Sequence, residues 1–282
     1  MRKIKIIADS TCDLEKDYLK ENDIEIIPLG ISFKDESFED GVNLSTAELY
    51  RLVDEKKMLP KTFAPGIEKY KEVFKKWVDA SYDVLFISIS SYLSSGFQNA
   101  YIASQEFDNH VFCVDSKNLS SGIGLIILKA VKFKNEGKTI QEIVTLLNEK
   151  IIPNVRSQFI VDTLDYLYKG GRCSSLAFIF GKSLHIHPII LVKEGKMIVY
   201  KKPRGKIVNG LNELLEIFKK DLSEMDLDTV MITHSIAPEY EKYLHQEVKK
   251  YIDEDNIMHT NAGCVISSHC GKGTIGILYI KK

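Results

Sequence analysis

The hydrophobic pattern of the first half of the chain alternates between two kinds of segment. Short apolar, β-branched runs predict strands, and apolar residues three or four positions apart predict helices. The predicted strands are Lys3–Ala8, Glu25–Phe33, Val84–Ile89 and Val111–Asp115. The predicted helices follow Asp13, begin near Ser45, Ile67 and Gly96, and cover Ser121–Phe133 and Thr139–Lys150. Strands that alternate with helices in this way are typical of an α/β fold.

The second half repeats the alternation after a break. Because proline cannot continue a helix, Pro153 should end the preceding one, so we expect a domain boundary near residues 152–157. We predict two α/β domains, an N-terminal one over residues 1–155 and a C-terminal one over residues 156–282. The later predicted strands are Phe159–Val161, Met197–Lys201, Thr229–Thr233 and Thr274–Ile280, and the later helices are Lys206–Leu222 and Pro238–Ile252.

Composition and charge restrict the classes of function that the chain can have. The 282 residues carry 38 basic and 39 acidic side chains, a balance that argues against a nucleic-acid partner because phosphate binding needs a basic face. No apolar run approaches bilayer length, so no integral membrane segment is expected and a cytoplasmic location is predicted. The five cysteines are scattered and odd in number, which favours free thiols over a disulfide framework.

Two sequence patterns suggest cofactor or metal chemistry but lack the required context. Residues 271–276 match G-x-G-x-x-G, yet the predicted strand that follows leaves no helix to receive a pyrophosphate, so a glycine turn is expected instead. Cys264, His269 and Cys270 could supply three metal ligands, but their spacing matches no zinc motif. We therefore expect neither a cofactor nor a metal, with glycine-rich turns around these residues.

Hydroxyl side chains follow several predicted strands. They occur in Asp9-Ser10-Thr11, in Lys61-Thr62 and in the run Ser90–Ser95. In an open α/β sheet such loops line the ligand crevice, where hydroxyls and helix amides can hold a negative charge. Each hydroxyl taken alone is more often a helix cap. Together they indicate a site for a small anionic molecule.

A serine nucleophile is the alternative interpretation of the same run. Ser94 lies just before a predicted helix, as a hydrolase nucleophile does, although the elbow pattern G-x-S-x-G is absent. Such an enzyme also needs a histidine beside the serine, and either His269 or His234 could serve. An acyl hydrolase or transferase that uses Ser94 therefore stays open beside a binding protein.

Several motifs in order along the chain resemble one family. They are Asp9-Ser10-Thr11, Thr62, the run from Ile89 to Ala100, the run from Leu164 to Arg172, Pro203-Arg204-Gly205 and the run from His269 to Gly273. In this combination the chain resembles the DegV family of bacterial fatty-acid-binding proteins.

The resemblance implies two α/β domains with one long-chain fatty acid, such as palmitate, buried between them and no other cofactor. It implies that Thr62 and Ser94 hold the carboxylate, with Ser95, His269 and Arg172 near the head group. It further implies a non-catalytic protein, able to touch membranes transiently, that presents its lipid to an ATP-using fatty acid kinase subunit for acyl-phosphate formation. In that encounter the residue matching Arg204 contacts the partner.

Three positions depart from the family pattern. Phe63 follows the matched threonine where the family has a small polar residue, Gly96 stands one position later than the usual glycine, and Lys272 replaces a proline. Phe63 bears on the shape of the pocket, and the other two bear on the backbone of their turns.

Overall fold

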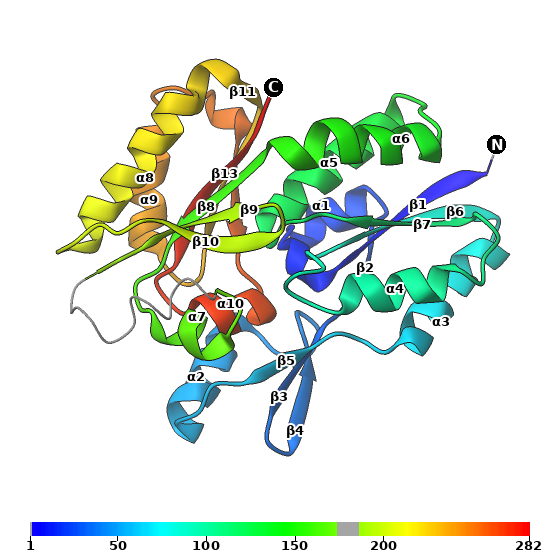
Figure 1. Ribbon diagram of the computed structural model, residues 1–282, viewed down its shortest axis with the longest axis horizontal. Helices are drawn as coiled ribbons and strands as arrows, with labels where there is room; N and C mark the ends of the chain where they lie inside the picture. Colours follow the sequence, from blue (N-terminus) through cyan, green and yellow to red (C-terminus); the bar gives the residue numbers. More distant parts are fainter. Residues whose placement is uncertain (1, 174–185) are drawn as a thin grey trace.

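The computed structural model describes residues 2–173 and 186–282, and its helices pack around three β-sheets (Figure 1). A parallel sheet of order β2-β1-β6-β7 is formed by β1 (Lys3–Asp9), β2 (Glu25–Ile27), β6 (Tyr82–Ser88) and β7 (Val111–Asp115). A mixed sheet of order β10-β9-β8-β13-β11-β12 is formed by β8 (Val155–Ile160), β9 (Ile189–Lys193), β10 (Lys196–Lys201), β11 (Met225–His234), β12 (Ile257–Asn261) and β13 (Ile275–Lys281). The small antiparallel sheet, of order β4-β3-β5, is formed by β3 (Gly30–Phe33), β4 (Glu36–Glu39) and β5 (Lys61–Phe63). This architecture confirms the predicted α/β class.

The helices cover both large sheets. They are α1 (Lys16–Glu21), α2 (Thr46–Lys56), α3 (Ile67–Asp79), α4 (Gly96–Ser104), α5 (Ser121–Asn135), α6 (Ile140–Leu146), α7 (Asp165–Gly170), α8 (Ile207–Asp221), α9 (Pro238–Val248) and α10 (Cys264–Cys270). A capping box of Thr139 and Glu142 starts α6. The chain continues from α6 into a π-helical turn and then a 3₁₀ turn that contains Pro153, so the helix predicted to Lys150 loses its α form earlier.

Helix α5 joins the two large sheets. Its residues Ile123, Ile126 and Ile127 are fully buried in one apolar cluster, which includes Leu85 of the parallel sheet and Leu278 of the mixed sheet. Helices α8 and α9 cover the opposite face of the mixed sheet (Figure 1). Because α5 is buried against both sheets, the loop at its N-terminus lies between them.

One predicted strand is wrong as a single element. The segment Glu25–Phe33 is divided at Pro28 into β2 in the parallel sheet and β3 in the small sheet. Proline has no N–H for a ladder hydrogen bond and favours a change of direction, so the apolar run changes sheets there.

Some short elements have no prediction because they are too short to show a period. They are β4, β5, β9, β12, α7 and α10. The last of these corrects the expected glycine-rich turn, since Cys264, His269 and Cys270 lie on a helix. The glycines of the G-x-G-x-x-G pattern do form a turn, with positive φ at Gly271 and Gly273, and a strand follows as expected.

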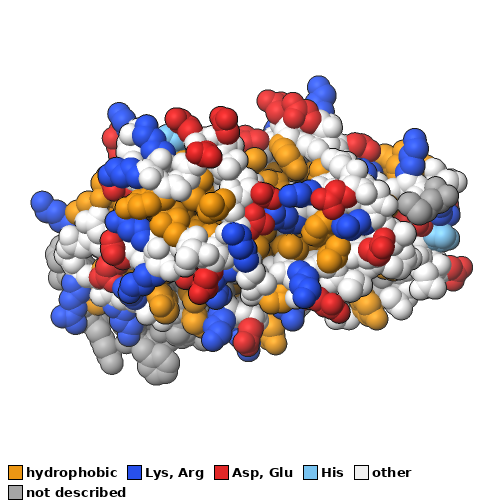
Figure 2. All heavy atoms as spheres, turned by 90° about the horizontal axis from the view of Figure 1, so that it is seen from above, with side chains coloured by type: hydrophobic (Ala, Val, Ile, Leu, Met, Phe, Trp, Pro, Cys, Tyr) orange, Lys and Arg blue, Asp and Glu red, His pale blue; other side chains and the backbone are white. Residues whose placement is uncertain are grey.

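The surface agrees with the nearly neutral charge. Figure 2 shows a face on which basic and acidic side chains are interspersed instead of separated. All five cysteines are free thiols, as predicted. Within the described ranges, no helix has both the length and the apolar character needed to cross a bilayer.

Candidate functional site

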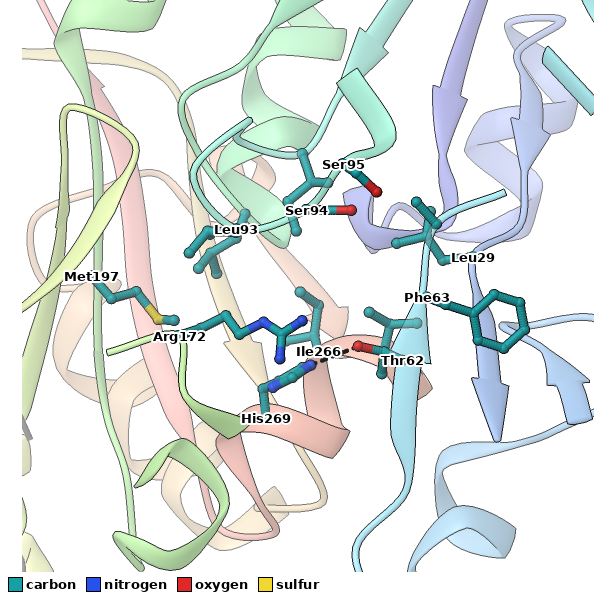
Figure 3. Close-up of a pocket in the computed structure, with 14 residues that line it drawn as sticks. Leu29, Thr62, Phe63, Leu93, Ser94, Ser95, Arg172, Met197, Ile266 and His269 are labelled. Atoms are coloured by element: carbon teal, nitrogen blue, oxygen red, sulfur yellow. Dashed lines mark hydrogen bonds between the residues drawn. The ribbon is translucent and has the colours of Figure 1, made fainter. Parts of the chain in front are cut away.

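A cavity of about 300 Å³ is lined by residues of β5 in the small sheet, of β10 in the mixed sheet, of the loops that follow β6 and β7 of the parallel sheet, and of α10. This volume lies at the lower end of the range for small-molecule sites, about 300–1,000 Å³. Its polar lining comes from Thr62, Ser94, Ser95, Arg172 and His269 (Figure 3). Its apolar lining includes Leu29, Ile89, Leu93, Leu119, Met197 and Ile266. The five residues predicted for the head group therefore line one cavity, although they are distant in sequence.

A smaller inner cavity of about 50 Å³ adjoins the first. The two share Leu119, Met197, Ile266 and His269 in their linings. Polar residues that line the inner cavity direct their polar atoms into the protein. Thr274 donates to the carbonyl of Cys270, for example, and the Ser235 hydroxyl pairs with those of Tyr50 and Ser267. The inner cavity is thus suited to a hydrocarbon chain.

Thr62 is held by His269. Thr62 lies on β5, opposite Ile31 of β3, and its Oγ1 is 2.8 Å from His269 Nε2. His269 Nδ1 is buried against Gly170 and has no partner in the described part of the chain. An unpaired buried acceptor is tolerated better than an unpaired N–H, so we assign the ring proton to Nε2. His269 then donates to Thr62, which leaves the threonine O–H free to donate into the cavity.

The charge state of His269 follows from its surroundings. Burial, and to a smaller extent the positive charge of Arg172, lower its pKa to about 4. The imidazole is therefore neutral at physiological pH and acts through one N–H.

Ser94 has the same arrangement of acceptor and donor. Its Oγ accepts the Gly96 N–H at 3.2 Å, and this hydrogen bond closes a turn at the start of α4. One lone pair of the hydroxyl oxygen thus accepts this N–H, and the hydroxyl proton can point into the cavity. Ser95, the N-cap residue of α4, makes no side-chain capping bond and is exposed. Two hydroxyl donors beside a helix N-terminus suit a carboxylate.

The loops that carry the two hydroxyls are tied together. Asn99 of α4 donates its Nδ2–H to the carbonyl of Pro65 at 2.8 Å. Pro65 lies three residues after Thr62, and Asn99 lies five residues after Ser94. This bond fixes the spacing of the loops. Asn99 is one of the family-matched residues, but its structural role could not be read from the sequence.

Helix α10 is positioned by two buried carboxylates. Asp13 accepts the Gly263 N–H at 2.9 Å, and Asp40 accepts the Cys264 N–H at 2.7 Å. Burial raises the pKa of both carboxyls, while hydrogen bonds to hydroxyls and amides oppose the rise. His269, at the other end of α10, is thereby fixed at the cavity.

Arg172 lies at the exposed edge of the cavity. Its Nη1 donates to the carbonyl of Gly170, the last residue of α7, at 2.7 Å. Within the described ranges no ion pair joins it to a carboxylate, although such a structural pair is common for arginine. Figure 3 shows its guanidinium beside His269. A cation is thus available near the hydroxyls.

The first hydroxyl loop does not reach the cavity. Ser10 donates to Asp40 at 2.9 Å, and the Thr11 hydroxyl donates to Asp9. Both hydroxyls therefore stabilise buried carboxylates. Of the three loops expected to meet at the ligand, two contribute to the lining.

Two of the family departures leave the polar end intact. The Phe63 ring covers Gly30, where an added Cβ would lie only 2.1 Å from the ring, and Figure 3 shows the ring turned away from His269. Lys272 is exposed in the turn between α10 and β13. Arg204 is also exposed, in the turn between β10 and α8, and is absent from the cavity lining.

No group of three or more His, Cys, Asp or Glu side chains within the described residues is arranged to hold a metal ion.

Comparison with known proteins identifies the family. The family model described as "Uncharacterised protein, DegV family" matches residues 3–282. A DegV domain-containing protein of Clostridium acetobutylicum is 32% identical over 286 residues, covering 100% of both chains. The chain belongs to the DegV family. The resemblance first noted in the motifs is thus confirmed.

Solved structures of fatty-acid-binding proteins share the fold. A fatty-acid-binding DegV protein from Thermus thermophilus has a TM-score of 0.92 at 27% identity, with 100% of both chains covered. A stearic-acid-binding protein from Eubacterium ventriosum has a TM-score of 0.88 at 28% identity, with 99% of this chain and 98% of that chain covered. DegV of Bacillus subtilis, a fatty acid binding protein, has a TM-score of 0.87 at 27% identity over 100% of both chains.

The lowered pKa of His269 predicts a pH-dependent stability. Between about pH 6.5 and 4 the unfolded chain binds this proton and the folded protein does not, so the free energy of unfolding should fall as pH falls. We expect His269 to account for up to about 3 kcal/mol of this fall in the free energy of unfolding. Urea unfolding at pH 7 and 4.5 should show a smaller loss for His269→Gln than for the wild type.

The comparison of the two proteins isolates this one residue. Asp9, Asp13 and Asp40 have raised pKa values, so their contribution has the opposite sign, and it is lost as pH rises through those values. It is common to both proteins. Equal pH dependence in the wild type and His269→Gln would show that His269 is not held neutral by the fold.

Proposed function

We propose that this protein binds one long-chain fatty acid, with its carboxylate at Thr62 and Ser94 and its tail directed into the inner cavity. The observation that carries the proposal is the cavity itself, in which two hydroxyls with free protons face an otherwise mostly apolar space. Fatty-acid binding by the structural relatives from Thermus thermophilus, Eubacterium ventriosum and Bacillus subtilis supports it.

The energetics assign different roles to the two ends of the ligand. Burial of about 14 methylenes contributes on the order of 11 kcal/mol. Each hydrogen bond to a charged carboxylate contributes about 1.5–3 kcal/mol. The tail therefore provides most of the affinity, while Thr62, Ser94 and the nearby Arg172 fix the orientation of the head group.

The proposal extends to domains and partner. Residues 1–155 form the domain that carries the hydroxyl loops, and residues 156–282 form the domain that covers the acyl chain. The carboxylate, which lies near the exposed Arg172, is presented to an ATP-using fatty acid kinase subunit that converts it to an acyl phosphate. Arg204, exposed and outside the cavity lining, belongs to the surface that meets this partner.

Arg204→Ala separates binding from presentation. Because Arg204 is not part of the cavity lining, palmitate affinity should stay within about twofold of the wild type. The rate of acyl-phosphate formation with the partner kinase should fall at least about tenfold if the guanidinium contacts that subunit in a desolvated interface. Unchanged phosphorylation with unchanged binding would remove Arg204 from the partner surface.

The geometry favours binding over acyl-transfer chemistry. A serine nucleophile needs a histidine base that a carboxylate orients. Here His269 bonds Thr62 instead of Ser94, its Nδ1 has no carboxylate partner in the described part of the chain, and its pKa near 4 suits a base poorly. His234 is engaged by the Ala237 N–H and by Glu241.

One experiment tests the proposal against this alternative. The protein is mixed with p-nitrophenyl palmitate and, separately, titrated with palmitate in a calorimeter. We expect saturable binding of one palmitate per chain and no burst of p-nitrophenol. A burst that disappears in Ser94→Ala would establish the acyl enzyme and overturn the binding role.

A further inference from the structure

A buried polar atom without a hydrogen-bond partner lies near each of the two hydroxyls of the site. Few buried side-chain N or O atoms in residues 2–173 and 186–282 lack a hydrogen-bond partner, and two of them are His269 Nδ1 and the Tyr70 hydroxyl. His269 contacts Thr62, as described above. The Tyr70 and Ser94 hydroxyls both lie within 3.5 Å of the position that a Cβ on Gly96 would take, and Tyr70 is outside the cavity lining.

Tyr70 is held rigidly with its hydroxyl protonated. The side chain is 0% exposed, and its ring packs on Phe74 and Phe86 at centroid distances of 6.1 and 5.4 Å. Burial, together with the nearby charge of Asp9, raises the pKa of the phenol above its usual value. The group is therefore a hydrogen-bond donor in a fixed position.

Three hydroxyls converge at the first residue of α4. A Cβ added to Gly96 would lie 3.2 Å from the Tyr70 hydroxyl and 3.5 Å from both Ser94 Oγ and Ser88 Oγ. The Ser88 hydroxyl donates to Asp9 at 3.1 Å, so its proton is already committed. Within the described residues, Ser94 Oγ accepts only the Gly96 N–H and keeps one lone pair.

We propose that Tyr70 is a positioning residue that donates to Ser94 Oγ when Ser94 gives its own proton to a bound carboxylate. The inference rests on the proposed function, since it concerns how the same head group is recognised. A hydroxyl that donates to an anion becomes a better acceptor, because hydrogen bonds in a chain polarise one another. The contribution of Tyr70 therefore depends on the negative charge of the ligand.

In the free protein, the unpaired Tyr70 hydroxyl should lower the free energy of unfolding. A buried hydroxyl without a partner destabilises the folded state, and such groups in native proteins call for an explanation. Removing the hydroxyl should thus leave the melting temperature equal to or above that of the wild type. Loss of binding without loss of stability distinguishes a positioning residue from a packing residue.

The test compares two ligands of equal length. Palmitate and hexadecanol are titrated into the wild type, Tyr70→Phe and Tyr101→Phe, the last being a control at an exposed tyrosine of α4. For Tyr70→Phe we expect palmitate affinity to fall about fivefold with hexadecanol affinity unchanged. For Tyr101→Phe we expect neither to change.

Gly96→Ala provides a second test of the proposed hydrogen bond between Tyr70 and Ser94. The added methyl group enters the space shared by the Tyr70 and Ser94 hydroxyls without removing either of them. Alanine is also a better helix former than glycine, so the variant should fold. The same selective loss of palmitate affinity is expected.

The outcomes separate this inference from the proposed function. If the wild type fails to bind palmitate, both fall together. If the wild type binds but Tyr70→Phe and Gly96→Ala keep its ratio of acid to alcohol affinity, the role of Tyr70 is overturned and the proposed function stands. Equal loss of both ligands with a lower melting temperature would make Tyr70 a packing residue and would likewise overturn it.

Discussion

Replacement of both Thr62 and Ser94 by alanine is expected to weaken palmitate binding at least about 100-fold, because two charge-assisted hydrogen bonds are lost at about 1.5–3 kcal/mol each. Hexadecanol, which has no charge to stabilise, should lose far less. Calorimetric titration of both ligands measures the difference.

The double variant should remain folded. Both side chains line a cavity, and neither is fully buried in an apolar cluster. A matched control replaces two hydroxyls that lie outside the cavity lining and are exposed, Ser37→Ala with Thr163→Ala. Palmitate affinity equal to the wild type in the Thr62→Ala, Ser94→Ala protein would rule out the head-group assignment.

Ile266→Trp is expected to make binding depend on chain length. Ile266 lines both cavities, so an indole at this position should close the passage between them. Exclusion of about four methylenes from the inner cavity costs about 3 kcal/mol, or more than 100-fold in palmitate affinity. Octanoate, short enough to remain in the outer cavity, should bind within about fivefold of its wild-type affinity.

Ile266→Leu is the control, because it keeps the volume of the side chain. Overpacking by tryptophan could itself destabilise the protein by about 1–3 kcal/mol, so melting temperatures accompany the titrations. A parallel loss of palmitate and octanoate, or no loss of either, would place the acyl chain elsewhere.

Much of the fold could be predicted from local pattern. The long helices α3, α5 and α8 have enough turns to show their period, and the buried strands of the parallel sheet are continuous apolar runs. Elements of three to seven residues, such as β5 and α10, have no measurable period. Their formation depends on tertiary contacts, among them the bonds of Asp13 and Asp40 to the start of α10.

The site could be predicted only through the combination of motifs. Hydroxyls after strands indicated an anion, but Ser10 and Thr11 satisfy buried carboxylates while Thr62 and Ser94 line the cavity. Composition does not distinguish a hydroxyl that bonds a buried carboxylate from one that lines the cavity, because the difference depends on the direction of each loop. Tyr70 shows no sequence signal either, since an aromatic residue on the apolar face of a helix is ordinarily a core residue.

The central claim is that a fatty acid occupies the joined cavities with its carboxylate at the hydroxyl end. The most direct measurement is quantitative mass spectrometry of the lipid extracted from denatured protein after purification from cells. The wild type should release about one intact long-chain fatty acid per chain, and both the Thr62→Ala, Ser94→Ala protein and Ile266→Trp should release much less. Equal amounts from all three proteins, or none from the wild type, would contradict the account.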